Sequence, residues 1–243
     1  MILGFSTGSL YKHLEPLSNE AVDAISSTGC NAIELCALFN YRIELLNILD
    51  INKLKKFNYV SLHSSEELRY ANNVETRKLL NTIVKYNKIF KFDNIIIHSD
   101  IVDDWNIFKD YDLPFLFENI GRKDGFGYKL DEIIKIIENN HKLVLDLTHD
   151  YIVDKNMNLS NNLLKNYNNS IKEIHVSGYK KHGKDEQQHY PIYITQQKEM
   201  ISHLVPNIPT IIESVIPFEN KDYISELQKE YSFLKSLIKK SSQ

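Results

Sequence analysis

The chain has 243 residues, of which 42% are hydrophobic and 25% are charged, with a formal net charge of −3 and a pI near 6.3. This is the composition of an ordinary globular protein, and it offers nucleic acid no overall attraction. No apolar run approaches a membrane span of roughly 18 residues, so we expect no membrane partner. No basic signal segment opens the chain, and Cys30 and Cys36 suggest reduced thiols, so we expect a cytoplasmic protein.

The first half of the chain alternates short apolar runs, typical of buried strands, with amphipathic segments, typical of helices. Strands are predicted at residues 2–6, 32–36, 59–63 and 94–98. Helices are predicted around residues 19–28, 43–49, 73–90 and 105–110. Ser18 is suited to cap the first of these helices, and Gly29 is suited to end it.

The second half continues the alternation, with strands predicted at residues 114–118, 142–147, 171–176 and 210–215. Helices are predicted at 130–137, around 163–164 after a Ser160 cap, at 196–204 and at 222–238, and a polar loop at 178–189. Eight strands alternating with helices predict an α/β fold, a (β/α)8 TIM barrel, with residues 1–243 as a single domain. A doubly wound open sheet is the alternative.

Six of the apolar runs end on a side chain that can bind a metal. These residues are His63, His98, Glu118, Asp146, His175 and Glu213, and His149 follows three residues after Asp146. In a (β/α)8 barrel the carboxyl ends of the strands form the active site. Mixed imidazole and carboxylate ligands suit Zn²⁺, Mn²⁺ or Fe. The pattern therefore predicts a metal site, and the alternative is a purely structural polar layer.

The same segments resemble the xylose isomerase-like TIM barrel superfamily, which includes sugar isomerases, epimerases and endonuclease IV. The resemblance covers nearly the whole chain, but each motif is short. Residues 29–35 are similar to the second-strand G-x-x-x-I-E-L, and residues 146–149 to the sixth-strand D-x-x-H. The other matching segments are Glu118-Asn119, His175-Val176-Ser177, Ile212-Glu213 and His189-Tyr190-Pro191, with Gln187 where the family often has Asp.

The resemblance implies a site with one to three divalent ions per chain, Zn, Mn or Fe. It assigns a common metal to Glu118, Asp146, His175 and Glu213, and it suggests His63, His98, His149 and His189 as further ligands. Glu118 and Glu213 are the expected catalytic acid and base. The candidate substrate contacts are His149, Glu34, Arg122 in a loop of the expected active face, and Trp105, whose ring can stack on a sugar.

The function most favoured is a divalent-metal-dependent isomerase or epimerase of a sugar or sugar phosphate. In this mechanism the metal holds a small carbohydrate-like substrate, and a glutamate moves the proton. An endonuclease IV-like multinuclear phosphodiesterase is the alternative, although the lack of basic excess disfavours a nucleic acid substrate. A multinuclear iron oxidase acting on a peptide and a non-catalytic binding barrel are further alternatives, and a homo-oligomer is compatible with all of them.

Overall fold

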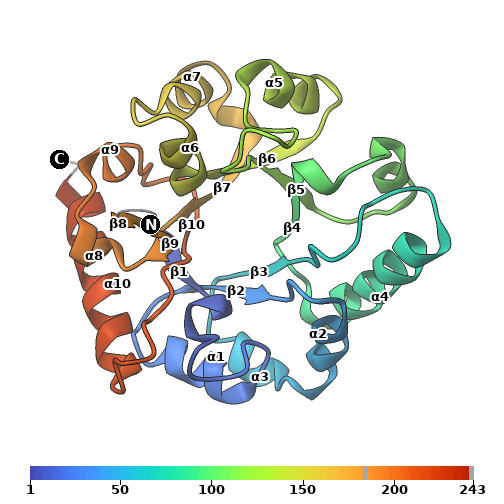
Figure 1. Ribbon diagram of the computed structural model, residues 1–243. Helices are drawn as coiled ribbons and strands as arrows, with labels where there is room; N and C mark the ends of the chain where they lie inside the picture. Colours follow the sequence, from blue (N-terminus) through green and yellow to red (C-terminus); the bar gives the residue numbers. More distant parts are fainter. Residues whose placement is uncertain (183–184, 241–243) are drawn as a thin grey trace.

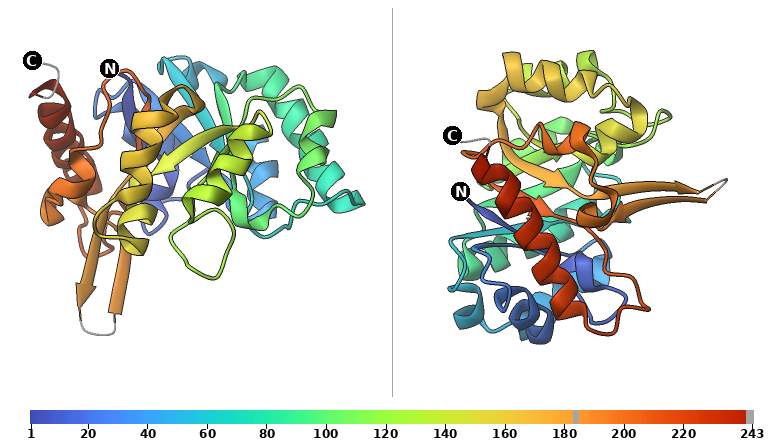
Figure 2. Two further views of the ribbon diagram at one scale, coloured as in Figure 1. Left: turned by 90° about the horizontal axis from the view of Figure 1, so that it is seen from above. Right: turned by 90° about the vertical axis from the view of Figure 1, so that its left-hand side faces the viewer.

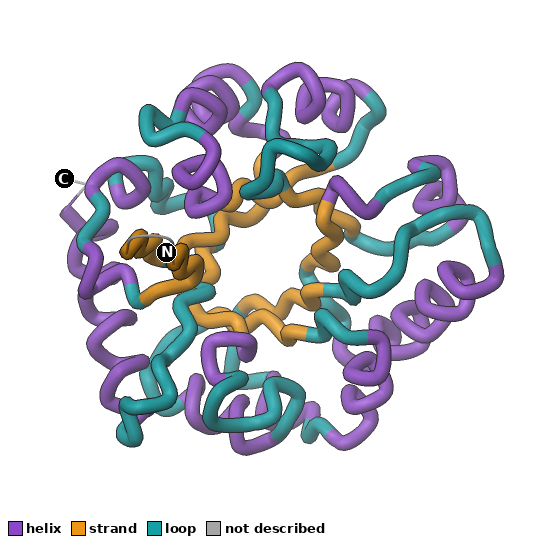
Figure 3. Tube along the Cα trace, in the orientation of Figure 1, coloured by secondary structure: helices purple, strands orange, loops and turns teal. Residues whose placement is uncertain are grey.

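The computed structural model describes residues 1–182 and 185–240, with the side chains of all of these except residues 182, 185–187 and 239–240. Eight parallel strands close into a barrel in the order β1-β10-β7-β6-β5-β4-β3-β2. Figures 1 and 3 show this ring of strands at the centre, with helices around it. The predicted (β/α)8 barrel is therefore confirmed, and the open-sheet alternative is wrong.

The barrel strands match the predicted runs to within a few residues. Their bounds are β1 Leu3–Ser6, β2 Ala32–Cys36, β3 Tyr59–His63, β4 Asn94–His98, β5 Phe115–Glu118, β6 Lys142–Asp146, β7 Ile171–Val176 and β10 Thr210–Ile212. Successive side chains of a strand point to opposite faces, so residues two apart share a face. Ile96, Leu116 and Val144 form one buried apolar cluster, and each lies two residues before a predicted metal ligand. The cluster therefore lies beneath the polar carboxyl end of the barrel.

Helices and short 3-10 turns surround the strands. Their bounds are η1 Thr7–Leu10, α1 Asn19–Ser26, α2 Asn40–Leu45, η2 Leu46–Ile48, α3 Ile51–Leu54, α4 Val74–Phe90, η3 Ser99–Ile101, η4 Trp105–Asp110, α5 Leu130–Glu138, α6 Leu147–Val153, α7 Asn158–Asn166, η5 Asn168–Ser170, α8 Ile192–Thr195, α9 Lys198–Ile201 and α10 Tyr223–Lys240. The Ser18 side chain caps α1 by accepting a hydrogen bond from the N–H of Ala21 at 3.1 Å. Gly29 adopts a left-handed φ of 74° three residues beyond that helix, as its position predicted. Cys30 and Cys36 are free thiols and both are buried.

The predicted polar loop at 178–189 is wrong, because this segment forms an antiparallel hairpin. The hairpin pairs β8, Gly178–His182, with β9, Asp185–Tyr190. Figure 2 shows it projecting away from the barrel. A projecting hairpin has no apolar face to bury against a core, so the segment lacks the alternating pattern that identifies other strands.

One strand prediction and two helix predictions also need correction. The strand predicted to reach Leu147 ends at Asp146, whose side chain caps α6 through the N–H of His149 at 2.8 Å. Ser160 lies inside α7 instead of capping it, and its N–H and hydroxyl both donate to Asp150, at 2.8 and 2.6 Å. The helix expected at 196–204 is replaced by the two short helices α8 and α9. Within the described residues, no helix is long and apolar enough to cross a membrane.

Candidate metal centre

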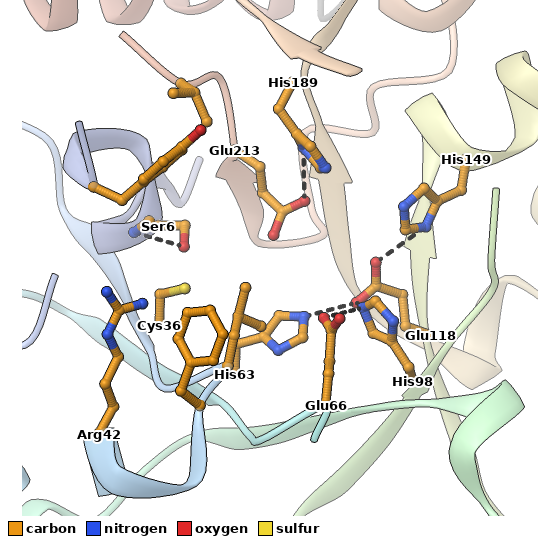
Figure 4. Close-up of a pocket in the computed structure, with 15 residues that line it drawn as sticks. Ser6, Cys36, Arg42, His63, Glu66, His98, Glu118, His149, His189 and Glu213 are labelled. Atoms are coloured by element: carbon orange, nitrogen blue, oxygen red, sulfur yellow. Dashed lines mark hydrogen bonds and ion pairs between the residues drawn. The ribbon is translucent and has the colours of Figure 1, made fainter. Parts of the chain in front are cut away.

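The strand register brings the predicted ligands together at one end of the barrel. His98 pairs in register with Glu118, and Asp146 pairs with His175. Glu213 follows directly after β10. These carboxyl ends border a cavity of about 280 Å³. Its lining residues, most of which Figure 4 labels, are Ser6, Gly8, Tyr11, Cys36, Leu38, Phe39, Arg42, His63, Glu66, His98, Glu118, His149, His189, Glu213 and Val215.

Four side chains offer the best-formed metal site. One ligand atom from each of Glu118, Asp146, His175 and Glu213 lies within 4.8 Å of the others. Both carboxylate oxygens of Glu118, Oδ2 of Asp146 and Nδ1 of His175 are buried and have no hydrogen-bond partner among the described residues. Buried polar atoms normally have partners, since an unpaired one costs free energy. The donor set and its unpaired atoms therefore fit a divalent ion.

A second group of possible ligands lies beside the first. His63, Glu66 and His98 also place ligand atoms within 4.8 Å of one another. Nε2 of His98 is 3.1 Å from Oε1 of Glu66 and 3.6 Å from Oε2 of Glu118, while Nε2 of His63 is 3.3 Å from that same Glu118 oxygen. Glu118 is thus placed between the two groups. Sequence reasoning did not identify Glu66, which lies in the loop after β3 and outside any strand-end pattern.

Local hydrogen bonds fix the orientation of His149. Its Nδ1 lies 2.8 Å from the carbonyl oxygen of Asn119, so Nδ1 is suited to donate and Nε2 to accept or bind a metal. Asn119 in turn holds Asp146, accepting from its N–H at 2.7 Å and donating to its carbonyl at 2.9 Å. A Cβ at Gly121 would lie 2.9 Å from Cδ2 of His149, so this loop approaches the ring closely only because it has glycine there.

His189 lies at the edge of the cavity, above Glu213. Its Nδ1 is 3.7 Å from Oε2 of Glu213 and 3.3 Å from the hydroxyl of Ser177. Its backbone has a left-handed φ of 55°, and its carbonyl accepts from the N–H of Val215 at 2.7 Å. His189 is therefore close enough to belong to the site, although it is not part of the four-residue group.

The carboxylates and imidazoles change one another's protonation. Burial disfavours ionisation of Glu118, but the positive charges of His175 and His98 outweigh it and lower its pKa well below the ordinary value. Burial also disfavours the charged forms of His63 and His149, yet nearby carboxylates raise the pKa of each to about 10. The pKa of Glu213 is instead raised well above its ordinary value, chiefly by burial.

Two fully buried carboxylates lie beneath His175. Its Nε2 is 3.1 Å from Oε1 of Glu173, a hydrogen-bonded contact, and 3.2 Å from Oε2 of Glu34. Glu173 also accepts hydrogen bonds from the hydroxyls of Tyr59 at 2.5 Å and Ser61 at 3.1 Å. An Nε2–H held by Glu173 leaves Nδ1 of His175 free to face Glu118 and Glu213. Sequence reasoning missed Glu173, which lies two residues before His175 on the same strand face.

Other predicted substrate contacts lie outside the cavity. Glu34 is fully buried and lines no part of it, so its side chain supports His175 instead. Trp105 is half-buried and packs on Phe117 and His141, with ring centroids 4.8 and 5.4 Å away, and it does not line the cavity. Arg122 forms an ion pair with Asp100 in a neighbouring depression that also includes His98 and His149. The side chain of Gln187 lies outside the described residues.

Known structures share the fold of this barrel. The probable 3-DHS dehydratase AsbF of Bacillus anthracis superimposes with a TM-score of 0.64 at 13% identity, and the match covers 97% of this chain and 99% of AsbF. IolI with a bound zinc atom gives 0.64 at 11% identity over 99% of both chains. D-psicose 3-epimerase with D-tagatose, from Clostridium cellulolyticum H10, gives 0.60 at 12% identity over 98% of this chain and 99% of its own.

The chain therefore has the xylose isomerase-like TIM barrel fold, as its sequence motifs suggested. A fusion protein whose name contains that fold matches 97% of this chain with 42% of its own length, at a TM-score of 0.63 and 11% identity. No protein-family model matches the sequence, and no curated protein does. At these identities the similarity establishes the fold, and the chemistry has to be argued from the site itself.

Proposed function

We propose that the protein is a divalent-metal-dependent isomerase or epimerase of a small carbohydrate-like substrate. The observation that carries the proposal is the four-residue group of Glu118, Asp146, His175 and Glu213, in which the first three residues have buried ligand atoms without hydrogen-bond partners among the described residues. A cavity of about 280 Å³ suits a ligand near the size of a monosaccharide, because small-molecule pockets start at roughly 300 Å³. The neighbour named as D-psicose 3-epimerase is consistent with this chemistry.

The residues at the cavity have different proposed roles. Glu118, Asp146 and His175 would hold a divalent ion, which supplies Lewis-acid polarisation of a substrate carbonyl. Glu213 borders the cavity and burial raises its pKa, so its carboxyl group is placed to exchange a proton with the substrate. His149 is placed to donate or accept at the substrate through Nε2, since Nδ1 is engaged by Asn119.

The test combines metal analysis with proton exchange. The purified protein is stripped, reloaded with Mn²⁺, Zn²⁺ or Fe²⁺, and incubated with a panel of ketoses in D₂O. We expect NMR to show deuterium at the carbon next to the carbonyl and formation of an epimer or isomer. Glu213→Gln is the matched control and should bind metal without exchange. If metal-loaded protein exchanged no proton on any ketose of the panel, the proposal would fail.

A multinuclear phosphodiesterase is the second candidate, and one observation favours it. The second group, His63, Glu66 and His98, lies next to Glu118, so two ions could share that carboxylate. Two zinc ions per chain together with hydrolysis of bis(p-nitrophenyl) phosphate would support this function over isomerisation. Two or more irons with oxygen consumption would instead support an oxidase.

A further inference from the structure

Arg42 borders the same cavity as the candidate metal centre. It is the one Lys or Arg among the described residues that line this cavity, and it is 9% exposed. Figure 4 shows Arg42 beside Cys36, on the opposite side of the cavity from Glu118 and His149. A buried guanidinium facing a ligand cavity needs an explanation, because arginine is almost never buried without a partner.

Aromatic side chains hold the guanidinium in place. Its central carbon lies 4.9 Å from the ring centroid of Phe39 and 5.8 Å from that of Tyr41, and the two rings stack on each other. Arg42 belongs to the first turn of α2, where its N–H donates to the carbonyl of Phe39 at 2.9 Å. Stacking occupies the face of a guanidinium and leaves its edge available for hydrogen bonds in the plane.

That edge is where Arg42 differs from the other arginines. Arg69, Arg77 and Arg122 each place Nη2 against a carboxylate, of Asp103, Asp110 and Asp100 respectively. Arg42 instead meets Glu15 through Nε, at 2.8 Å and without hydrogen-bond geometry. No hydrogen bond to its Nη1 or Nη2 is found within the described part of the chain. The two nitrogens that best match a planar anion are therefore unengaged.

We infer that Arg42 forms an anion-binding subsite of this cavity, and that the substrate carries a phosphate or carboxylate group away from its reacting carbon. The inference rests on the proposed function for the reacting end only. The cavity is lined by Glu66, Glu118 and Glu213 together with His63, His98 and His149, and these groups surround the candidate metal centre. Arg42 is the permanently charged cation on the opposite side of the cavity, so it is placed to receive an anionic group that lies away from a metal-bound end of the substrate.

The experiment uses one ketose in three forms. Binding of D-fructose, D-fructose 6-phosphate and D-fructuronate to Mn²⁺-loaded protein is measured by calorimetry. We expect at least one anionic form to bind about tenfold or more tightly than fructose, the factor of one charge-assisted hydrogen bond. Which anionic form gains tells phosphate from carboxylate. In Arg42→Gln the affinity for the anionic form should fall to within about twofold of the affinity for fructose, while the affinity for fructose itself stays the same.

Matched variants separate recognition from folding. Arg69→Gln removes an exposed arginine outside the cavity and should leave all three affinities unchanged. Glu15→Gln removes the competing acid, so the anionic form should bind more tightly, whereas a purely structural Arg42–Glu15 pair would only lose stability. If Arg42→Gln does not fold, Arg42→Lys replaces it, and loss of the bidentate edge should still weaken the preference.

The outcomes distinguish the two proposals. If fructose binds and exchanges its proton but neither anionic form is preferred, the subsite is refuted and the proposed function remains. If no ketose binds, inorganic phosphate is titrated into the metal-loaded protein. Phosphate binding that Arg42→Gln weakens about tenfold would keep the subsite and reject the ketose substrate. Binding of phosphate that is indifferent to Arg42 would refute the subsite.

Discussion

Replacing Asp146 tests whether the strand-end cluster exists to hold an ion. The two carboxylate oxygens of Asp146 have separate roles. Oδ1 accepts from the N–H of His149 and caps α6, while Oδ2 is buried, has no hydrogen-bond partner among the described residues and lies 3.6 Å from Nδ1 of His149. Asp146→Asn keeps an oxygen for the cap and removes the negative charge. Asp146→Ala removes both. The pair of variants therefore divides the residue's structural role from its metal role.

The magnitudes follow from these contacts. Loss of an N-cap costs about 0.5–2 kcal/mol, so Asp146→Ala should be destabilised by that amount without metal. Asp146→Asn should stay near wild-type stability without metal, because it loses the attraction between the Asp146 charge and His149, 3.6 Å away, but also relieves the repulsion that helps to raise the pKa of Glu213. An ion at one hundred times its Kd adds about 2.7 kcal/mol to the wild type, and both variants should lose this gain.

The assay is thermal unfolding with and without saturating Mn²⁺, together with metal content by mass spectrometry after gel filtration. Wild-type protein should gain several degrees from metal, since about 1 kcal/mol shifts the Tm of a chain of this size by roughly 2–4 °C. A metal-induced shift in Asp146→Asn equal to that of the wild type would refute the assignment of Asp146 as a ligand. Unchanged metal content in Asp146→Ala would remove it from the site altogether.

Four further predictions address the neighbouring groups. Glu118→Gln should release metal and abolish activity. Glu213→Gln should keep the fold and lower kcat by a factor of about 10²–10⁴. Full activity in either variant would eliminate the proposed role of that residue. Glu173→Gln replaces the hydrogen-bond acceptor beneath His175 and should weaken metal binding by about 10–100-fold. Competition with a chelator measures this change. An unchanged Kd for the metal would mean that Glu173 does not position the His175 ring. The pKa of His63 is raised to about 10 because carboxylates outweigh burial. An ion held by Glu118 must therefore compete with the His63 proton, 3.3 Å from that carboxylate, and the Mn²⁺ affinity should rise about tenfold per pH unit for each proton displaced. For the same reason metal-free protein should lose stability as the pH rises from 6.5 through about 10, where His63 gives up the proton that its partners favour; stability that is flat over this range would contradict the pairing.

Local sequence patterns predicted the barrel and much of the site. Apolar runs such as Leu143 to Leu145 mark strands because both strand faces are buried, and the polar residue that ends each run marks the carboxyl end. The ligand atoms of Glu118, Asp146, His175 and Glu213 then meet because parallel strands end on one side of a closed barrel. The hairpin at 178–190 escaped prediction, since its pairing is not recorded in an apolar alternation.

What the sequence determined by itself is therefore which residues stand at strand ends, because strand periodicity and burial are local properties of the chain. Closure of the barrel decided the rest. It placed Glu34 and Glu173 beneath His175, put Glu66 beside His98, packed Trp105 against Phe117, and brought Arg42 to the wall of the cavity. These contacts join segments far apart in the chain, and their distances depend on strand register and loop paths that no local pattern records.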